Sequence, residues 1–516
     1  MNSLTRRGLG RMGLAGATIL AAGGTRAEDT APKRGGTLVY AQLTANRLSA
    51  DAKTAKHPYY IVDANTRNQW NCLTWVNEKL EWEYELAKNI EPTDDKMNVW
   101  DVALREGVLF HNGQEMTAKD VVASFEYHRE KGPFQRQIVK IEAVSKYLAR
   151  FTLDAGNSEF PFILAEYTSI IMPAAAPNVI GLDGVGTGPF RIVSTDPNRS
   201  IIMERFEGYW RKGFPYLDRV ECHNREGQQE AALNGLRAGQ FDVVFNIDPR
   251  AVKQLSGDPA YDIASARGAY EFVLQLPKHP GSPFLDKRIR QALALAIDRE
   301  AIVRVAYGGN NGWVGNDSHL VFIDPNFVPR PKGRDVAKAK SLLAEAGFPN
   351  GITLPTLYYS QQMAEVPTYF QVLQQSVKDA GITLPIEERP TDGYFQFRTG
   401  ESDLSKGKYH KFAMTAVGAR NPGISLFRMR NAYVESGHWS GPAQDQYMEL
   451  YGQAMITREA DKRKAIYARM QAILFEEVPA ILPAGGSNFL VKRKAIRKLA
   501  FHPQAWSVRL DEVWKA

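Results

Sequence analysis

Cysteine is scarce in this sequence, and the local motifs typical of enzymes are missing. Cys72 and Cys222 are the only cysteines among 516 residues. They could pair in an oxidising compartment or remain two buried thiols, and their spacing does not decide between the two. The chain holds no GxSxG elbow, HExxH, P-loop or CxxC motif, and its nine histidines are dispersed. No local metal motif is therefore present.

The glycine-rich segment 184–188 resembles a phosphate-binding loop, but its surroundings argue against that use. Such a loop places its amides at the N-terminus of a helix. Here Pro189 follows, and the sequence continues as an extended segment. With no better candidate in the chain, we predict no nucleotide, no other cofactor and no metal.

Long apolar runs are absent as well, apart from one short run near the N-terminus. Arg6 and Arg7 precede the apolar run Met12–Ala22, and small residues lead to Ala27. These are the regions of an export signal, and paired arginines are typical of the twin-arginine route. A membrane anchor is the alternative, but the run is too short to cross about 30 Å of hydrocarbon. We expect cleavage after Ala27, no lipid anchor because no cysteine follows, and a periplasmic location.

A strong net charge is missing once that segment is set aside. The whole chain has 64 basic and 57 acidic residues, a formal charge of +7. Residues 1–27 hold four arginines and no acid, which leaves 60 basic against 57 acidic residues, or +3. No basic run with interleaved aromatic residues occurs elsewhere. We therefore expect no nucleic acid among the partners.

The remaining sequence, about 490 residues, alternates strand and helix patterns and is long enough for roughly three domains. Alternating runs at 190–194 and 201–206, separated by turn residues, predict a β-hairpin. An Asn-Gly turn at 112–113 leads to a helix capped by Thr117, with Asp120 as the capping-box acid.

A second α/β region is predicted beyond residue 270. Asp286 caps a helix that carries an apolar stripe on one face. Further on, strands are expected at 352–359 and 382–387 with a helix between them, which forms a β-α-β unit. Ligands gather at the carboxyl ends of such strands, so the polar residues after them are candidates for a binding cleft.

Several sequence strings in a fixed order carry a family resemblance. They are GTGPF at 186–190, ERFEGYW at 204–210, PYLDRVE at 215–221, ALNGLRAGQFDVV at 232–244, LREGVLFHNGQEMTAKDVVASF at 104–125 and DKRIRQALALAIDREAI at 286–302. Together they resemble the extracytoplasmic solute-binding proteins of the peptide/nickel type (family 5) that serve ABC importers. The resemblance covers nearly all of residues 35–510. It implies a bilobal α/β periplasmic-binding-protein fold (type II, cluster C-like) with an extra small α+β domain.

The resemblance also implies a domain organisation and a function. We expect an export signal at 1–27, a discontinuous lobe I at 28–79, 185–270 and 485–516, a small domain II at 80–184, and a lobe III at 271–484. The chain would be a monomer and not an enzyme. It would bind a peptide or a peptide-like, anionic conjugate between its lobes and deliver it to an ABC permease and ATPase complex. The alternatives are a secreted enzyme with dispersed catalytic residues and a ligand-sensing adaptor for a membrane receptor.

Candidate ligand-binding residues follow from the segments that line the cleft in relatives. The predicted set is Gln42, Thr44, Tyr59, Arg129, Gln361, Gln362, Arg420, Asn421, Gln504 and Trp506. Peptide-binding relatives place an acid, beside a tryptophan, after the strand that matches 412–417, where it meets the peptide's amino group. This chain has Arg420 and Asn421 there, and it has two amides where dipeptide-binding relatives place an arginine. A cation at 420 that faces the cleft would favour a carboxylate, phosphate or sugar acid over a free amine.

Overall fold

The structure is a computed structural model, and it describes twelve stretches of the chain. They are residues 31–43, 64–131, 134–176, 184–196, 199–225, 227–331, 333–361, 363–391, 393–399, 410–430, 436–504 and 507–516. By its internal contacts the chain divides into two compact units, Met1–Pro32 and Lys33–Ala516. All elements described below belong to the second unit.

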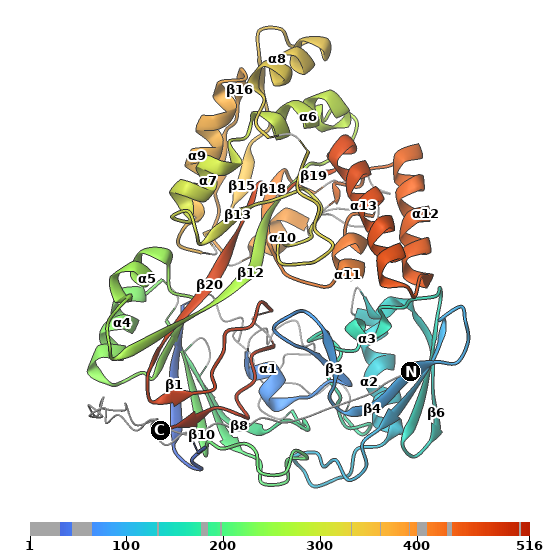
Figure 1. The fold of residues 1–516 in the computed structure, drawn as a ribbon, viewed down its shortest axis with the longest axis vertical. Coiled ribbons are helices and arrows are strands. Elements are labelled where there is room, and N and C mark those ends of the chain that lie inside the picture. Colours follow the sequence, from blue (N-terminus) through green and yellow to red (C-terminus); the bar gives the residue numbers. More distant parts are fainter. Residues whose placement is uncertain are drawn as a thin grey trace, which may run out of the picture. The chain divides into compact units, whose positions relative to one another are not determined.

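One large mixed sheet of twelve strands organises the second unit, and its two ends are built differently. At one end, parallel strands β10, β1 and β11 stand beside the antiparallel hairpin of β8 and β9. We call this end the β1 half (Figure 1). Its strands are β1 (Thr37–Gln42), β8 (Phe190–Asp196), β9 (Ser200–Arg205), β10 (Arg219–Asn224) and β11 (Val243–Phe245). The hairpin predicted from the turn at 196–199 is confirmed.

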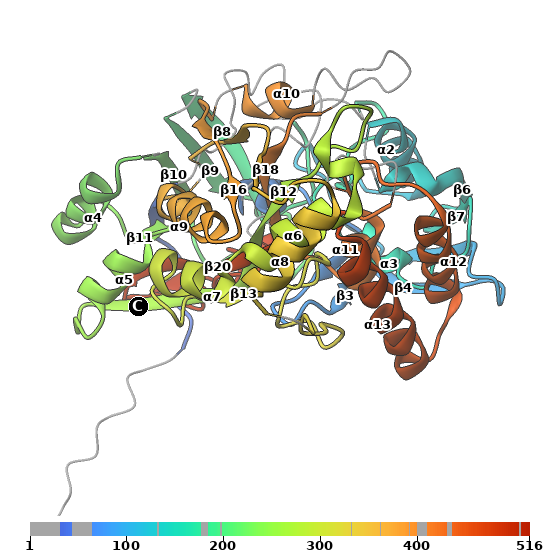
Figure 2. The ribbon, with the colours of Figure 1, turned by 90° about the horizontal axis from the view of Figure 1, so that it is seen from above.

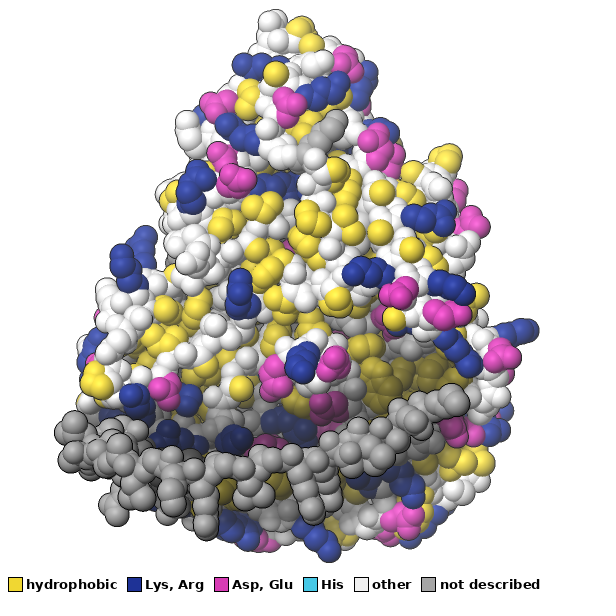
Figure 3. Space-filling view, in the orientation of Figure 1, with side chains coloured by type: hydrophobic (Ala, Val, Ile, Leu, Met, Phe, Trp, Pro, Cys, Tyr) yellow, Lys and Arg dark blue, Asp and Glu magenta, His cyan; other side chains and the backbone are white. Residues whose placement is uncertain are grey.

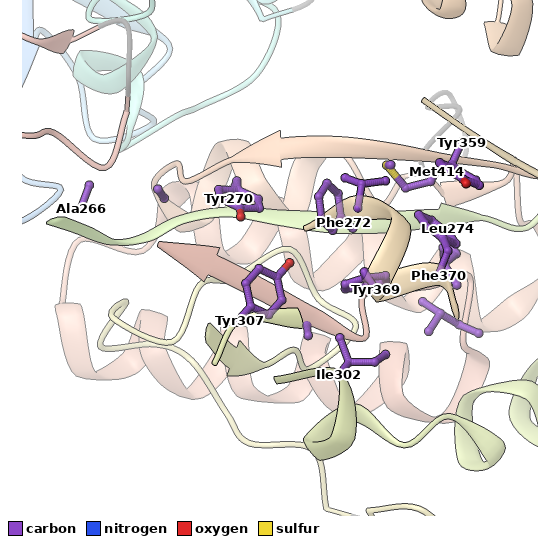
Figure 4. Packing of buried hydrophobic residues seen from close by; sticks show 14 of the residues in the cluster. Ala266, Tyr270, Phe272, Leu274, Ile302, Tyr307, Tyr359, Tyr369, Phe370 and Met414 are labelled. Atoms are coloured by element: carbon purple, nitrogen blue, oxygen red, sulfur yellow. The ribbon is translucent and has the colours of Figure 1, made fainter. Parts of the chain in front are cut away.

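The other end of the sheet, the β18 half, is covered by helices on both faces. Its strands are β15 (Leu357–Tyr359), β17 (Ile386–Glu388) and β18 (Ala413–Gly418). Successive residues of the adjacent strand β12 (Tyr261–Gln275) face opposite sides, so Phe272 and Leu274 enter one core and Val273 enters another. Figure 4 shows Phe272 and Leu274 packed against Tyr369 and Phe370 of a covering helix.

The helices of the β18 half form two groups, one on each face. The first group belongs to the core of Phe272 and comprises α6 (Lys287–Ala296), α7 (Arg299–Ala306), α8 (Val336–Glu345) and α9 (Val366–Lys378). The second belongs to the core of Val273 and comprises α11 (Pro422–Phe427), α12 (Pro442–Ile456) and α13 (Ala460–Glu477). In Figure 2, α7 and α9 of the first group lie to the left of β12 and β18, and the second group lies to the right.

Two long strands, β12 and β20 (Ala484–Arg493), connect the two halves (Figure 1). The first part of β12, residues 261–266, pairs with β20, and β20 also pairs with β11 of the β1 half. From Tyr270 onward β12 pairs with β18 as well. The register shifts between Ala266 and Tyr270, and Gly268 there has a φ of +72°, which few other residues adopt. The point where the two halves meet is therefore an irregular stretch of a paired strand.

A separate four-stranded sheet forms the small-sheet unit, residues 87–172. Its strands are β4 (Ala87–Pro92), β5 (Val99–Leu104), β6 (Ile138–Ser145) and β7 (Leu148–Leu153), covered by α2 (Ala118–Lys131). The predicted role of Asp120 as the capping-box acid is confirmed, because the Thr117 amide donates to Asp120 Oδ2 at 2.7 Å. The Thr117 hydroxyl donates to the same oxygen at 2.9 Å. Val121 and Phe125 of α2 are fully buried.

One prediction about the strands is wrong in a physically informative way. The stretch predicted as one strand at 352–359 is two, β14 (Ile352–Thr353) and β15, in different sheets. The stretch predicted at 382–387 also divides, into β16 (Ile382–Thr383) and β17. Pro355 and Pro385 lie at the two breaks. Proline has no amide hydrogen to donate to a strand ladder, so each run stops there and resumes on another partner.

Short elements complete the chain. They are α1 (Ala64–Gln69), β2 (Thr74–Val76), β3 (Trp82–Tyr84), α3 (Phe160–Ile163), α4 (Gln229–Ala238), α5 (Pro249–Leu255), β13 (Gly312–Val314), α10 (Tyr394–Thr399), β19 (Ala480–Ile481), β21 (Ile496–Arg497) and β22 (Trp514–Lys515). None of the helices in the described residues combines the length and apolar character that crossing a bilayer requires. Charged side chains of both signs are mixed over the face shown in Figure 3.

Both cysteines are buried thiols that form no disulfide, which answers the question that their spacing left open. Cys72 and Cys222 belong to the same large core. Burial raises the pKa of the Cys72 thiol to about 12, so this thiol stays protonated at neutral pH.

Candidate functional site

A cavity of about 540 Å³ lies between the β1 half and the β18 half. Its volume falls in the range of pockets that hold small ligands. The β1 half contributes Leu43, Gly227, Gln229 and 246–249; the connecting strands contribute Tyr270, Ser487 and Asn488; the β18 half contributes Gln361, 363–365 and 388–391. Both halves and the strands between them thus form its walls.

The carboxyl ends of strands supply much of this lining, as the α/β pattern predicts. Leu43 follows β1, Asn246 follows β11, and Arg389 follows β17. Asp248 is fixed by capping α5, because its Oδ1 accepts from the Ala251 amide at 2.7 Å. Gln229 of α4 holds the same carboxylate from the side, with Nε2 2.9 Å from Oδ2.

Carboxyl groups outnumber cations in the cavity. Asp248 belongs to the β1 half, whereas Glu365 and Glu388 belong to the β18 half. Glu365 accepts a hydrogen bond from the Tyr270 hydroxyl, and burial, with a smaller contribution from Asp248, raises the pKa of Glu365. Glu388 accepts from Tyr359 at 3.2 Å.

Arg389 is the cation that lines the cavity, and it is already engaged. Its Nη1 donates to Glu387 at 3.0 Å. Its guanidinium also lies over the ring of Phe397, 4.4 Å from the centroid.

Among the described residues, Gln361 is the one predicted ligand-binding residue that lines this cavity. Its side chain is exposed and follows the end of β15. Gln42 is the last residue of β1 and directly precedes Leu43, which lines the cavity. Thr44, Tyr59, Gln362 and Trp506 lie outside the described residues.

Arg129 lies away from this cavity. It belongs to α2 of the small-sheet unit. Its Nη1 donates to the Val139 carbonyl at 2.8 Å, and its guanidinium pairs with Glu126 in the same helix. These contacts pack Arg129 against the small sheet, and its assignment to the binding cleft stays a prediction.

Three other predicted residues meet at a second place, around the junction loop, residues 418–423. Arg420 is 6% exposed, and its Nε donates to Glu166 Oε1 at 3.0 Å. Asn421 donates to Glu159, and Gln504 Nε2 donates to the Ala419 carbonyl at 3.2 Å. The guanidinium of Arg420 therefore already faces a carboxylate of the protein. An anionic solute would have to displace Glu166 to bind there.

Glu159 and Glu166 are functional candidates that the sequence did not reveal. They lie 262 and 254 residues before the partners they bind, and no local motif marks them. The acids of the cavity were also missed, although Glu388 could have been found because it directly follows the strand predicted at 382–387. In the part of the chain that the structure describes, no group of three His, Cys, Asp or Glu side chains is placed to hold a metal ion.

Comparisons with known proteins agree with this architecture. Residues 81–431 match the family model described as bacterial extracellular solute-binding proteins, family 5 Middle. The glutathione-binding protein GsiB of Escherichia coli (strain K12) is 25% identical over 450 residues, which cover 83% of this chain and 86% of that protein. Its counterpart from Shigella dysenteriae serotype 1 matches over the same shares at the same identity.

Solved structures show the same fold at lower sequence identity. The periplasmic binding protein AgaA of A. tumefaciens R10, in complex with agropinic acid, has a TM-score of 0.78 at 20% identity, covering 93% of this chain and 99% of that one. DppA of Helicobacter pylori, in complex with the peptide STSA, has a TM-score of 0.76 at 22% identity, covering 94% and 98%. These likenesses confirm the predicted bilobal periplasmic-binding-protein fold.

Proposed function

This chain belongs to the bacterial extracellular solute-binding proteins of family 5, and from that premise we propose that it is the solute-binding component of an ABC importer. It takes a peptide or peptide-like conjugate into the cavity between its two halves and delivers it to a membrane permease. The β1 half corresponds to lobe I, the small-sheet unit to domain II, and the β18 half to lobe III.

The observation that carries this proposal is the cavity whose walls come from both halves. Two strands, β12 and β20, connect the halves, and their pairing is irregular at Gly268. Rotation about such a connection opens and closes the space between the halves, which is the domain motion of periplasmic binding proteins. A solute enclosed there would contact polar groups on both sides.

The chemistry of the lining supports a solute that carries amide or peptide groups. Gln361 and Asn488 offer both donors and acceptors, while Asp248 and Glu388 offer acceptors for ammonium or amide hydrogens. Glutathione, which names the E. coli relative, and the peptide held by DppA both combine amine or amide nitrogen with carboxylates, and AgaA holds agropinic acid. They are therefore the first solutes to test. We propose that Gln361 contacts the solute, and that Gln42, which lies beside the cavity, is a second candidate.

Location and partners follow the family. The protein works outside the cytoplasm, and we infer a periplasmic, monomeric form released by cleavage after Ala27 without a lipid anchor, exported by the twin-arginine route. Its partners are then a permease and an ATPase in the inner membrane. Mass spectrometry of the exported protein would test the cleavage, because a first residue other than Glu28 would contradict it.

Isothermal titration calorimetry of the exported protein with glutathione, the peptide STSA and agropinic acid tests the proposed function. We expect one of the three to bind with one-to-one stoichiometry and to be recovered unchanged. A solute at 100 times its dissociation constant should add about 2.7 kcal/mol to the free energy of unfolding. Conversion of the solute into a product would contradict the proposal.

A pair of glutamine variants locates the site. Gln361→Ala should weaken binding, because the cavity loses an amide that can donate and accept. Gln371→Ala is the matched control, since Gln371 is an exposed residue of α9 in the same half. Equal affinities of the two variants would place the solute elsewhere.

A further inference from the structure

The junction loop, residues 418–423, lies where three parts of the molecule meet. It runs from the last residue of β18 to the first turn of α11, so it belongs to the β18 half. Its Ala419 amide donates to the Ala269 carbonyl of β12 at 3.1 Å. The Ala419 carbonyl accepts from Gln504 of the C-terminal segment at 3.2 Å. On its remaining side the loop faces the small-sheet unit.

Two carboxylates of the small-sheet unit hold this loop. Glu166 pairs with Arg420, and the two side chains are 4% and 6% exposed. Glu159 accepts from Asn421 and from the Gly423 amide, the latter at 2.7 Å, and also from the Tyr467 hydroxyl of α13 at 2.7 Å. Because both acids are buried, the surrounding solvent screens these contacts little.

Apolar packing accompanies the two carboxylates. Ile424 and Phe427 of α11 are buried in the core of the small-sheet unit, although both residues belong to the β18 half. The Ser158 amide donates to the Met455 carbonyl at the end of α12, at 2.6 Å. Figures 1 and 2 both show α11 beside α3 of the small-sheet unit.

The small-sheet unit is carried by the β1 half. In the chain it lies between α1 and β8, and both elements neighbour each other in the β1 half. His111 Nε2 lies 3.0 Å from the Gly188 carbonyl, and Arg105 lies over the ring of Trp210. The contacts of Glu159 and Glu166 therefore bridge the same two halves that β12 and β20 connect.

We propose that the small-sheet unit acts as a latch that holds the two halves closed. The ion pair between Glu166 and Arg420 and the hydrogen bonds that Glu159 accepts form this latch. Every contact of this latch is between protein groups and needs no atom of a solute. Closure then does not depend on the solute alone, and the solute-free protein populates the closed arrangement. The inference takes from the proposed function only that the two halves move relative to each other.

The test measures the distance between the halves without any solute. Lys253 of α5 and Lys340 of α8 are exposed, one in each half, and are replaced by cysteines for spin labelling. The native Cys72 and Cys222 are buried, so they label slowly. Double electron–electron resonance gives the distribution of distances between the labels.

We expect the solute-free wild type to show mainly the shorter distance. Glu159→Gln combined with Glu166→Gln should move most molecules to a longer distance. Glu106→Gln is the control, since its ion pair with Lys88 is exposed and lies within the small-sheet unit. A wild type that is mainly open, or a double variant with an unchanged distribution, would overturn the proposal.

A charge reversal covers the case in which the double variant does not fold. Glu166→Arg alone should open the protein, and adding Arg420→Glu should restore the shorter distance. Failure of the reversed pair to restore closure counts against the latch. The distance measurement uses no solute, so it can still be interpreted if none of the tested solutes binds.

Discussion

Glu271 on β12 should make the stability of this protein fall as the pH rises, and Glu271→Gln should remove that fall. The side chain is 1% exposed. Its Oε1 accepts from Trp313 Nε1 at 3.4 Å, and its Oε2 has no hydrogen-bond partner among the described residues. Burial raises the pKa of Glu271 from 4.5 to about 8, and nearby Asp317 adds to the rise while Arg299 and the Trp313 bond oppose it.

The direction of the pH dependence follows from that raised pKa. Below pH 4.5 the carboxyl is protonated in both the folded and the unfolded chain, so it costs nothing. Between pH 4.5 and about 8 the unfolded chain ionises while the folded chain stays protonated, which favours unfolding. Each pH unit costs about 1.4 kcal/mol, so between pH 5 and pH 8 wild type should lose up to about 4 kcal/mol at this one site. Glutamine keeps the shape and does not ionise.

Urea unfolding of wild type and Glu271→Gln at several pH values between 5 and 9 measures the effect. The free energy of unfolding of the variant minus that of wild type should rise across this pH range and level off above pH 8. Glu449→Gln, an exposed change on α12, should give a flat difference and serves as the control. A flat difference for Glu271→Gln as well would show that this carboxyl is ionised in the folded protein, and the reasoning from burial would be refuted.

Two further predictions concern the small-sheet unit and the thiols. Thr117→Ala should cost about 1 kcal/mol of stability, because it removes the hydrogen bond that the Thr117 hydroxyl donates to Asp120 at the start of α2; an unchanged urea midpoint would contradict a stabilising role for this bond. Cys72 and Cys222 should react with a thiol reagent only when the protein unfolds, because both are buried thiols outside any disulfide; rapid modification of the native protein would contradict their burial.

The features that were predicted correctly depend on residues that lie close together in the sequence. Asp286 caps α6 as expected, accepting from the Arg288 amide at 2.8 Å. The hairpin of β8 and β9 and the capping box at Thr117 likewise depend on neighbours within a few positions. The prediction of one strand at 352–359 was wrong because the apolar pattern continues across Pro355, whereas the strand hydrogen bonding is interrupted there.

The candidate site was predicted less well, since its residues meet only in the folded chain. Gln361 was found because it follows a predicted strand, and the same rule applied to β17 would have found Glu388. Arg420 was singled out as a cation that could bind an anionic solute, and this role stays a prediction. Its partner Glu166 is 254 residues away in the sequence, and no local motif near either residue predicts the ion pair.

The sequence by itself determined the alternation of strands and helices, their caps and the family, because these depend on local backbone preferences and on motifs in a fixed order. Only the tertiary structure decided which charges are paired and which polar groups line the cavity. The energy of a carboxylate depends on its burial and on the nearest cation, and both are set by segments that lie far apart in the chain. Arg420 is the clearest case: the sequence shows a cation and no partner for it, and the fold pairs it with Glu166.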